Sequence, residues 1–378
     1  MKIRPLLTGA AAVAAALAVS AAGTPAASAH HGDDDAGRLD TIASGLDGPR
    51  GVDALGHGRT LVTQTDGSFD LVVEHRGADA TVIPLGQIAT DFAPAISLGR
   101  HGWVYLLTGG AEPGAPLSEN AAKLWRWRHG MDAPVMVVDI AAYQQTDPDP
   151  YDLENLPGDS NPFGLAALRD GTVLVSDAAG NDLLRVWPHA QVVKTVARLK
   201  PREVTTPEGL PDAGSSVLAE AVATSVTVGK DGAWYVGELR GYPATPGTSE
   251  IWRIRPGTTN ATCDPEHPWG KCSRYADGLT SIVDLGAGPR GIYAVTLSKM
   301  TWLAVEGDNP PAGAEIGGLF LVQRRHHHGD AWHHGHGGVR ITELVPDQLT
   351  LPGGVDVADG HPYVVGPVFG PGSLMRVD

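Results

Sequence analysis

Short runs of apolar residues alternate with glycine-containing turns along most of the chain, and this pattern recurs six times. Most copies contain an apolar run, a turn of the Asp-Gly or His-Gly type, a second apolar run and an apolar–Arg–apolar segment. In the clearest copy these parts are 161–165, Asp170-Gly171, 173–177 and 184–186. Apolar runs of this length joined by such turns are typical of β-hairpins. The pattern therefore predicts an all-β protein built from repeated antiparallel units.

The spacing of the copies predicts the kind of repeat. Equivalent positions lie at 49, 94, 162, 225, 281 and 352. A four-stranded propeller blade needs roughly 40–50 residues, so the excess must lie in loops. The sixth copy ends at Asp378 without a fourth strand, whereas segment 39–46, before the first copy, has the character of one. We therefore predict a six-bladed β-propeller over residues 39–378, its ring closed by the N-terminal strand completing the last blade.

The first 29 residues have the pattern of a secretory signal peptide. Lys2 and Arg4 precede an alanine-rich apolar run, and Ala27-Ser28-Ala29 has the form of a cleavage site. The alternative, a membrane anchor, is disfavoured because polar and small residues interrupt the run. No later stretch has the length of a membrane span. We expect a secreted protein that has no membrane association after cleavage and begins with a disordered segment, residues 30–38.

Composition and charge narrow the class of protein. Acidic residues outnumber basic ones by 43 to 28, which disfavours a general nucleic-acid-binding protein. The chain has only two cysteines, so cysteine-rich zinc and iron–sulfur sites are excluded. In an exported protein Cys263 and Cys272 are expected to form a disulfide, and two free thiols are the alternative.

Several motifs of the repeats resemble those of a known family. They are Ser160-Asn161-Pro162-Phe163-Gly164, the segment 176–186, and the segment 207–255 with Tyr235-Val236-Gly237-Glu238-Leu239. The repeats are similar to six-bladed TolB-like and NHL-like propellers and, more narrowly, the chain resembles the ScyD/ScyE family over nearly its whole mature length. Many actinobacterial members of that family are secreted and have no assigned activity, so the resemblance implies fold and export rather than chemistry.

Long insertions suggest where a ligand would bind. In a propeller, the loop that enters each innermost strand and the loop between the second and third strands lie on one face. Five long insertions fall on that face, and loops gathered on a rigid scaffold often form a binding site. They are 109–123, 143–160, 200–223, 239–249 and 298–317. The ligand, whether a protein, a glycan or a small molecule, is not identified by the sequence.

Four polar residues are expected near the mouth of the channel on this face: Asn161, Asp177, Glu238 and Asp284. Carboxylate and amide oxygens suit Ca²⁺ or Mg²⁺, which gives a candidate metal site. Two alternatives remain open. Asp177 is equally explained as an acceptor of turn hydrogen bonds from Gly180 or Asn181, and Asp284 as a partner of neighbouring backbone or arginine.

Six histidines lie in one short segment: His326, His327, His328, His333, His334 and His336. Imidazoles at this density can chelate Zn²⁺, Ni²⁺ or Cu²⁺. The glycines among them argue against a preorganised catalytic site, so any such binding is expected to be adventitious.

The sequence favours a secreted propeller that acts as a non-catalytic binding or scaffold protein, because it has no Gly-x-Ser-x-Gly elbow and no other catalytic motif. The alternative is a metal-dependent, lactonase-like hydrolase with its site at the channel. Convergent carboxylates in an accessible channel would favour the hydrolase, and a plugged channel would favour the scaffold.

Overall fold

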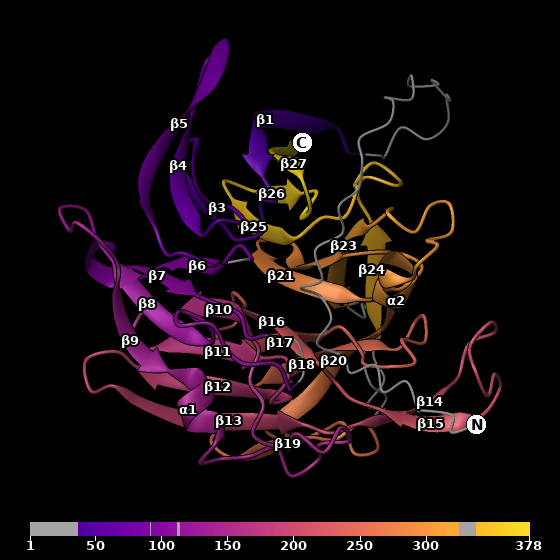
Figure 1. The fold of residues 1–378 in the computed structure, drawn as a ribbon. Coiled ribbons are helices and arrows are strands. Elements are labelled where there is room, and N and C mark those ends of the chain that lie inside the picture. The colour runs from indigo at the N-terminus through magenta and orange to yellow at the C-terminus, as the bar shows by residue number, and fades with distance from the viewer. Residues whose placement is uncertain (1–36, 91, 112–113, 325–337) are drawn as a thin grey trace, which may run out of the picture.

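The computed structural model describes residues 37–90, 92–111, 114–324 and 338–378. Six antiparallel sheets surround a central channel, which confirms the predicted six-bladed propeller (Figure 1). The innermost strand of each sheet contacts the innermost strands of both neighbouring sheets, so the ring is closed.

The first three blades follow the chain in order. Blade 1 consists of β2 (Val52–Gly56), β3 (Arg59–Thr63), β4 (Ser68–His75) and β5 (Ala78–Gln87). Blade 2 consists of β6 (Ala95–Leu98), β7 (Val104–Leu107), β8 (Lys123–Trp127) and β9 (Val135–Asp139), with a 3₁₀ turn, η2 (Arg100–Gly102), between β6 and β7. Blade 3 consists of β10 (Pro162–Ala167), β11 (Val173–Asp177), β12 (Asp182–Trp187) and β13 (Val192–Leu199).

The last three blades include the closure. Blade 4 consists of β16 (Ala223–Val228), β17 (Trp234–Glu238), β18 (Ser249–Ile254) and β20 (Cys272–Leu279). Blade 5 consists of β21 (Ile282–Gly288), β22 (Gly291–Thr296), β23 (Gly318–Arg324) and β24 (Val339–Glu343). Blade 6 consists of β25 (Gly354–Ala358), β26 (His361–Gly366), β27 (Pro371–Val377) and the N-terminal β1 (Leu39–Asp47).

The predicted ring closure is confirmed. Strand β1 pairs antiparallel with β27, from Leu39 opposite Val377 to Asp47 opposite Pro371. The two strands lie side by side near the C-terminus in Figure 1. The first strand of the propeller therefore completes its last blade.

Several elements were not expected from the repeats. The hairpin of β14 (Arg202–Thr205) and β15 (Ser216–Ala219) lies in the long loop between blades 3 and 4. Strand β19 (Ala261–Cys263) pairs in parallel with β13, so a segment between two strands of blade 4 extends the sheet of blade 3. Two single-turn helices lie in connecting segments: α1 (Ile140–Gln144) follows β9, and α2 (Trp302–Glu306) lies between β22 and β23.

The core consists of six hydrophobic clusters, one between each pair of adjacent blades. Alternation along the strands explains this arrangement, because successive side chains of a strand point to opposite faces of its sheet. In β11, Val173 and Val175 pack toward blade 2, while Leu174 between them packs toward blade 4. Each sheet is therefore buried on both faces.

Two hairpins show how the turn residues fix the register. In the β2–β3 turn, His57 and Gly58 have φ angles of 54° and 67°, and in the β25–β26 turn Asp359 and Gly360 have φ angles of 51° and 88°. The tight two-residue turns that match the twist of β-hairpins require two consecutive residues with positive φ angles. His101-Gly102 meets this requirement as well, whereas in Asp170-Gly171 and Asp231-Gly232 only the glycine has a positive φ angle.

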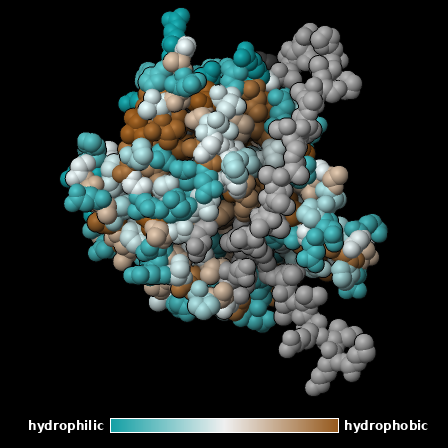
Figure 2. Space-filling view, turned by 45° about the horizontal axis from the view of Figure 1, so that its top comes forward, coloured by the Kyte–Doolittle hydropathy of each residue, from teal (hydrophilic) through white to brown (hydrophobic). Residues whose placement is uncertain are grey.

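The face of the molecule seen in Figure 2 is mostly polar, with hydrophobic areas toward its top. Among the described residues, no helix combines the length and the apolar character that a membrane crossing needs.

Candidate functional site

A cavity of about 260 Å³ occupies the channel, and all six innermost strands line it. Three carboxylates face this cavity: Asp53 on β2, Asp284 on β21 and Asp356 on β25. They come from blades 1, 5 and 6, which are consecutive around the ring. Blades 3 and 4 contribute apolar side chains instead, among them Leu165 and Val226. The channel thus has an acidic side and an apolar side.

Each of the three carboxylates accepts a hydrogen bond from the backbone of the next blade. Val355 N donates to Asp284 Oδ2 at 2.8 Å, and Ala54 N donates to Asp356 Oδ2 at 2.8 Å. The N–H of Leu98 in β6 donates in the same way to Asp53. These bonds connect adjacent innermost strands, so the carboxylates have a structural role whatever else they bind.

Electrostatics distinguishes these groups from ordinary surface aspartates. Burial raises the pKa of Asp53 and of Asp284 to about 6, although backbone hydrogen bonds oppose the change. Burial and then the neighbouring charge of Asp53 raise the pKa of Asp356 well above its usual value, and Asp284 adds to this effect. The three acids therefore repel one another in a partly desolvated space, which favours the uptake of protons or of a cation.

One arginine closes the channel where the innermost strands begin. Arg50 is 5% exposed, and its Nη1 donates to Ala93 O at 3.0 Å. A second hydrogen bond runs to Phe163 O, and the guanidinium lies 3.7 Å from the centre of the Phe163 ring. Burial lowers the pKa of Arg50 to about 10, while the charge of Asp284 opposes this shift. The cavity is thus plugged at the long-loop end, and its wall extends to Leu98, Val228 and other residues at the opposite ends of the strands.

Of the four predicted channel residues, the structure places Asp284 in the cavity wall and the other three elsewhere. Asn161 lines a separate pocket of only about 20 Å³ on the long-loop face, and its Oδ1 accepts from Gly110 N at 2.8 Å. That pocket also contains Glu220, whose pKa burial raises to about 7.

Asp177 is fully buried, and its carboxylate is saturated by protein donors. It accepts from Ser160 Oγ at 2.6 Å, from Asn161 N at 2.7 Å, from Gly180 N at 3.1 Å and from Gln144 Nε2 at 3.2 Å. The hydrogen bond from Gly180 is the turn interaction that the sequence suggested as an alternative. Asp177 therefore organises the turn after β11 and presents no free oxygen to the channel.

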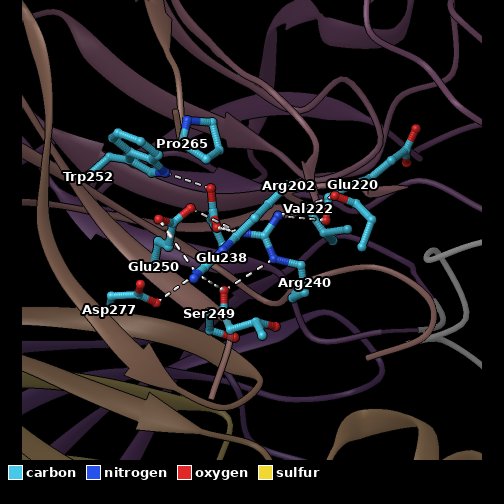
Figure 3. A network of polar contacts seen from close by, with 12 residues as sticks. Arg202, Glu220, Val222, Glu238, Arg240, Ser249, Glu250, Trp252, Pro265 and Asp277 are labelled. Atoms are coloured by element: carbon cyan, nitrogen blue, oxygen red, sulfur yellow. Dashed lines mark hydrogen bonds and ion pairs between the residues drawn. The ribbon is translucent and has the colours of Figure 1, made fainter. Parts of the chain in front are cut away.

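Glu238 lies in a buried ion network of blade 4 (Figure 3). Its carboxylate pairs with Arg240 and accepts from Trp252 Nε1 at 2.6 Å. Arg240 also binds Glu250 at 3.1 Å, and Arg274 and Arg202 contact Glu250 from the other side. Glu238 and Glu250 are 0% exposed and Arg240 is 1% exposed. Burial raises the pKa of Glu238, and the Arg240 guanidinium opposes that rise.

The structure confirms the predicted disulfide between Cys263 and Cys272. Because Cys263 ends β19 in the sheet of blade 3 and Cys272 begins β20 in blade 4, the bridge fastens the outer edges of two blades. The histidine segment, His326 to His336, lies outside the described residues, and so does the signal peptide. Metal binding by these histidines stays a prediction.

Two channel acids, Asp53 and Asp356, were missed from the sequence. A signal for them exists, because Val-Asp recurs in the innermost strands of three repeats, at Val52-Asp53, Val283-Asp284 and Val355-Asp356. An aspartate next to a buried valine at the same place in several repeats points into the channel, since alternate residues of these strands face it.

No protein-family model matches the chain, and no curated protein sequence matches it either. The ScyD/ScyE resemblance therefore stays a prediction. Solved structures with the same architecture do match. A putative oxidoreductase (glucose dehydrogenase) of Thermus thermophilus is 17% identical with a TM-score of 0.53, and the match covers 90% of this chain and 100% of that one.

Two further structures match over similar lengths. The PQQ-bound aldose sugar dehydrogenase of Streptomyces coelicolor is 13% identical with a TM-score of 0.53, covering 91% of this chain and 99% of that one. A gluconolactonase of Xanthomonas campestris is 11% identical with a TM-score of 0.50, covering 90% and 89%. At these identities the likeness shows the propeller fold, and the fold alone does not identify an activity.

Proposed function

We propose that this protein is a secreted, cation-dependent enzyme that acts on a small oxygen-rich substrate at the open end of its channel. The observation that carries the proposal is the group of three mutually repelling carboxylates, Asp53, Asp284 and Asp356, around a cavity of about 260 Å³. Among the fold neighbours are proteins named as sugar dehydrogenases and a gluconolactonase, so a sugar lactone is the first substrate to test.

The donor set fits a hard divalent cation such as Ca²⁺ or Mg²⁺, which prefers carboxylate and other oxygen ligands. The oxygens of Asp53, Asp284 and Asp356 do not all lie within 4.8 Å of one another, so these carboxylates would hold a hydrated ion partly through its water ligands. A bound cation of this kind can polarise a carbonyl oxygen of the substrate. It would also offset the repulsion by Asp53 and Asp284 that adds to the raised pKa of Asp356.

The protein's own groups supply the rest of the site. Without the cation, burial holds the pKa of Asp53 and Asp284 at about 6, so both carboxylates are ionised at neutral pH and can bind the cation. Arg50 and Phe163 close the far end of the cavity, so a substrate enters from the end where the innermost strands finish. The apolar side of the channel, with Leu165 and Val226, would hold the carbon skeleton.

Titration calorimetry with CaCl₂ and MgCl₂ tests the cation site. We expect one ion per chain in the wild type and at least a tenfold loss of affinity in Asp356→Asn. The matched control is Asp170→Asn, which removes an aspartate that pairs with Arg185 on the surface and should leave the affinity unchanged. The proposal fails if no ion binds, or if Asp356→Asn binds as tightly as the wild type. Hydrolysis of glucono-lactone with and without the cation then tests the reaction.

A cleft on the outside of the propeller supports a second candidate function. On the outer side of blades 3 and 4, a cleft of about 740 Å³ lies between the loop before β10, the β14–β15 hairpin and the disulfide loop. Leu218 in this cleft is 57% exposed, and Tyr151 and Leu153 lie nearby. A cleft made by long loops, in which these apolar and aromatic side chains lie among charged ones, supports the non-catalytic binding function expected from the sequence.

A glycan array probed with the wild type and with Leu218→Asp tests this second function. Glycan binding that is lost in Leu218→Asp, while calcium binding persists, would support it. Glycan binding that is equal in the two proteins, or absent from both, would count against glycan recognition in this cleft.

A further inference from the structure

A second charged cavity lies between blades 4 and 5 and adjoins the open end of the channel, because Gly229 and Gly288 line it while Val228 and Ala287 line the channel cavity. Its volume is about 480 Å³, and it is lined by the β16–β17 turn, the β21–β22 turn and the outer strands of blade 5. We call it the basic cleft, because four cationic side chains line it: Lys230, Arg290, Arg324 and Arg340. All four are exposed to solvent.

The cations of the basic cleft are not neutralised by the protein. Within the described part of the chain, no ion pair involves Lys230, Arg290, Arg324 or Arg340. The one carboxylate in the lining is Asp231, and it accepts from Arg253 Nε at 3.0 Å and from Arg253 Nη2 at 2.8 Å. This concentration of positive charge is unexpected in a chain of net charge −15.

Hydrogen bonds order the walls that carry these cations. Lys230 Nζ donates to Pro289 O at 3.1 Å, which joins the two turns on either side of the cleft. Gln323 Nε2 donates to Arg290 O at 2.9 Å. These two bonds join the turns and the strand that form the walls of the cleft.

The floor of the basic cleft is aromatic. Tyr275 OH donates to Val322 O at 3.2 Å, and its ring meets that of Tyr235 edge to face at 4.9 Å. Burial raises the pKa of Tyr275 to about 12, so this phenol stays neutral at physiological pH. The Arg324 guanidinium lies 5.6 Å from the centre of the Tyr275 ring, with no carboxylate paired to it among the described residues.

We propose that the basic cleft binds a small organic anion whose carboxylate or phosphate group contacts the arginines and whose apolar part rests on Tyr275. Guanidinium groups match both kinds of anion through paired N–H donors. The surrounding acidic surface would repel such a ligand elsewhere, so its binding would be confined to this cleft. The cleft and the channel would then bind ligands of opposite charge.

The test compares three hexoses that differ in charge: glucuronate, glucose 6-phosphate and neutral glucose. Inorganic phosphate is the fourth probe, and binding is measured by calorimetry at low and high salt. We expect glucuronate or glucose 6-phosphate to bind more tightly than glucose, and we expect the affinity to fall with salt. The anion that binds more tightly shows whether the ligand's charged group is a carboxylate or a phosphate ester.

The variant Arg290→Gln/Arg340→Gln should lose at least tenfold in affinity for that anion. Its matched control is Arg76→Gln, in the exposed turn between β4 and β5, which should bind as the wild type does. Thermal unfolding of each variant verifies that the fold is intact. Equal binding by the double variant and the wild type would overturn the proposal. So would tight binding of glucose, binding of inorganic phosphate as an adventitious ion only, or no binding of either organic anion.

Discussion

The carboxylates of blade 4 and those of the channel differ in what balances their charge. Glu238 and Glu250 are fully buried, yet three arginines surround them and Trp252 donates a further hydrogen bond. Asp53 and Asp356 are less buried, and their partners are backbone amides and, for Asp53, the Ser97 hydroxyl, with no ion pair to either among the described residues. Depth of burial alone would have chosen Glu238 as the functional group.

The comparison teaches that a missing counter-charge is a better sign of a binding site than burial. A buried ion network that satisfies its own members holds the structure together, and removal of one partner is costly. A cluster of like charges around a cavity is destabilising in the absence of a ligand, so a protein that retains it has a use for it. Four predictions test this distinction, from the largest expected effect to the smallest.

Arg240→Ala should break the blade 4 network. It leaves two fully buried carboxylates without their shared cation, so we expect a loss of about 3–5 kcal/mol in the free energy of unfolding. Urea denaturation measures this loss. Arg38→Ala, which removes an exposed arginine paired with Asp40, is the control and should cost under about 1 kcal/mol. Similar effects of the two substitutions would show that the network is not structural.

Removal of the disulfide should weaken the same outer region without affecting the channel. Cys263 and Cys272 close a loop with a sequence separation of 9, and Cys263→Ser/Cys272→Ser should cost about 2–3 kcal/mol through the greater freedom of the unfolded chain. The measurements are thermal unfolding and calcium titration. A loss of calcium affinity would show that the two regions are coupled, against our comparison.

The stability of the cation-free protein should respond to pH through the channel acids. Because the pKa values of Asp53 and Asp284 are about 6 in the folded state, the folded protein binds more protons than the unfolded chain between pH 4 and 6. The free energy of unfolding contributed by these groups therefore falls as the pH rises through this window.

In Asp284→Asn the part of that fall that Asp284 causes should be absent. We expect the stability difference between variant and wild type to move by about 2 kcal/mol in favour of the variant between pH 4 and pH 7. Urea denaturation at the two pH values measures it. A difference that does not change with pH would mean that the channel acids keep ordinary pKa values.

Replacing one acidic side chain by its uncharged amide should change the stability in opposite directions in the channel and in the blade 4 network. Asp356→Asn keeps an oxygen that can accept from Ala54 N and removes repulsion from Asp53, so at pH 8 it should stabilise the cation-free protein by about 1 kcal/mol. Glu238→Gln should destabilise it, because Arg240 loses a partner. The melting temperatures of the two variants are measured at pH 8. Changes of the same sign would contradict the distinction between the channel and the blade 4 network.

Most of the architecture followed from local patterns. The six copies, their turns and the strand at 39–46 predicted the blades and the closure. Hairpin turns and the alternation of side chains along a strand depend on residues that are close in sequence. The parallel pairing of β19 with β13 could not be predicted in this way. It joins Ala261–Cys263 to a strand of the preceding blade, and it depends on how the outer strands approach one another in space.

The site was harder to predict than the fold. Asp284 was identified, and its backbone partner was anticipated, whereas Asp177 and Glu238 were candidates that proved to be saturated by local donors and arginines. Whether a carboxylate is paired depends on residues distant in sequence, such as Gln144 for Asp177 and Arg274 for Glu250. The repeated Val-Asp pairs were the part of the site that a comparison of the copies could reveal.

The seam between β1 and β27 also sets the order in which the molecule can be assembled. Blades 1 to 5 are each made of one continuous stretch, so they can form as the chain is synthesised, whereas blade 6 joins Leu39 to Val377. Until the last strand exists, the apolar cluster shared by blades 6 and 1 has no cover, and Leu46 and Val52 remain open to solvent. Such late pairing between residues distant in sequence is slow, and it leaves hydrophobic, aggregation-prone surface exposed. We therefore expect a nascent chain that has not yet reached residue 377 to be the stage most in need of a chaperone.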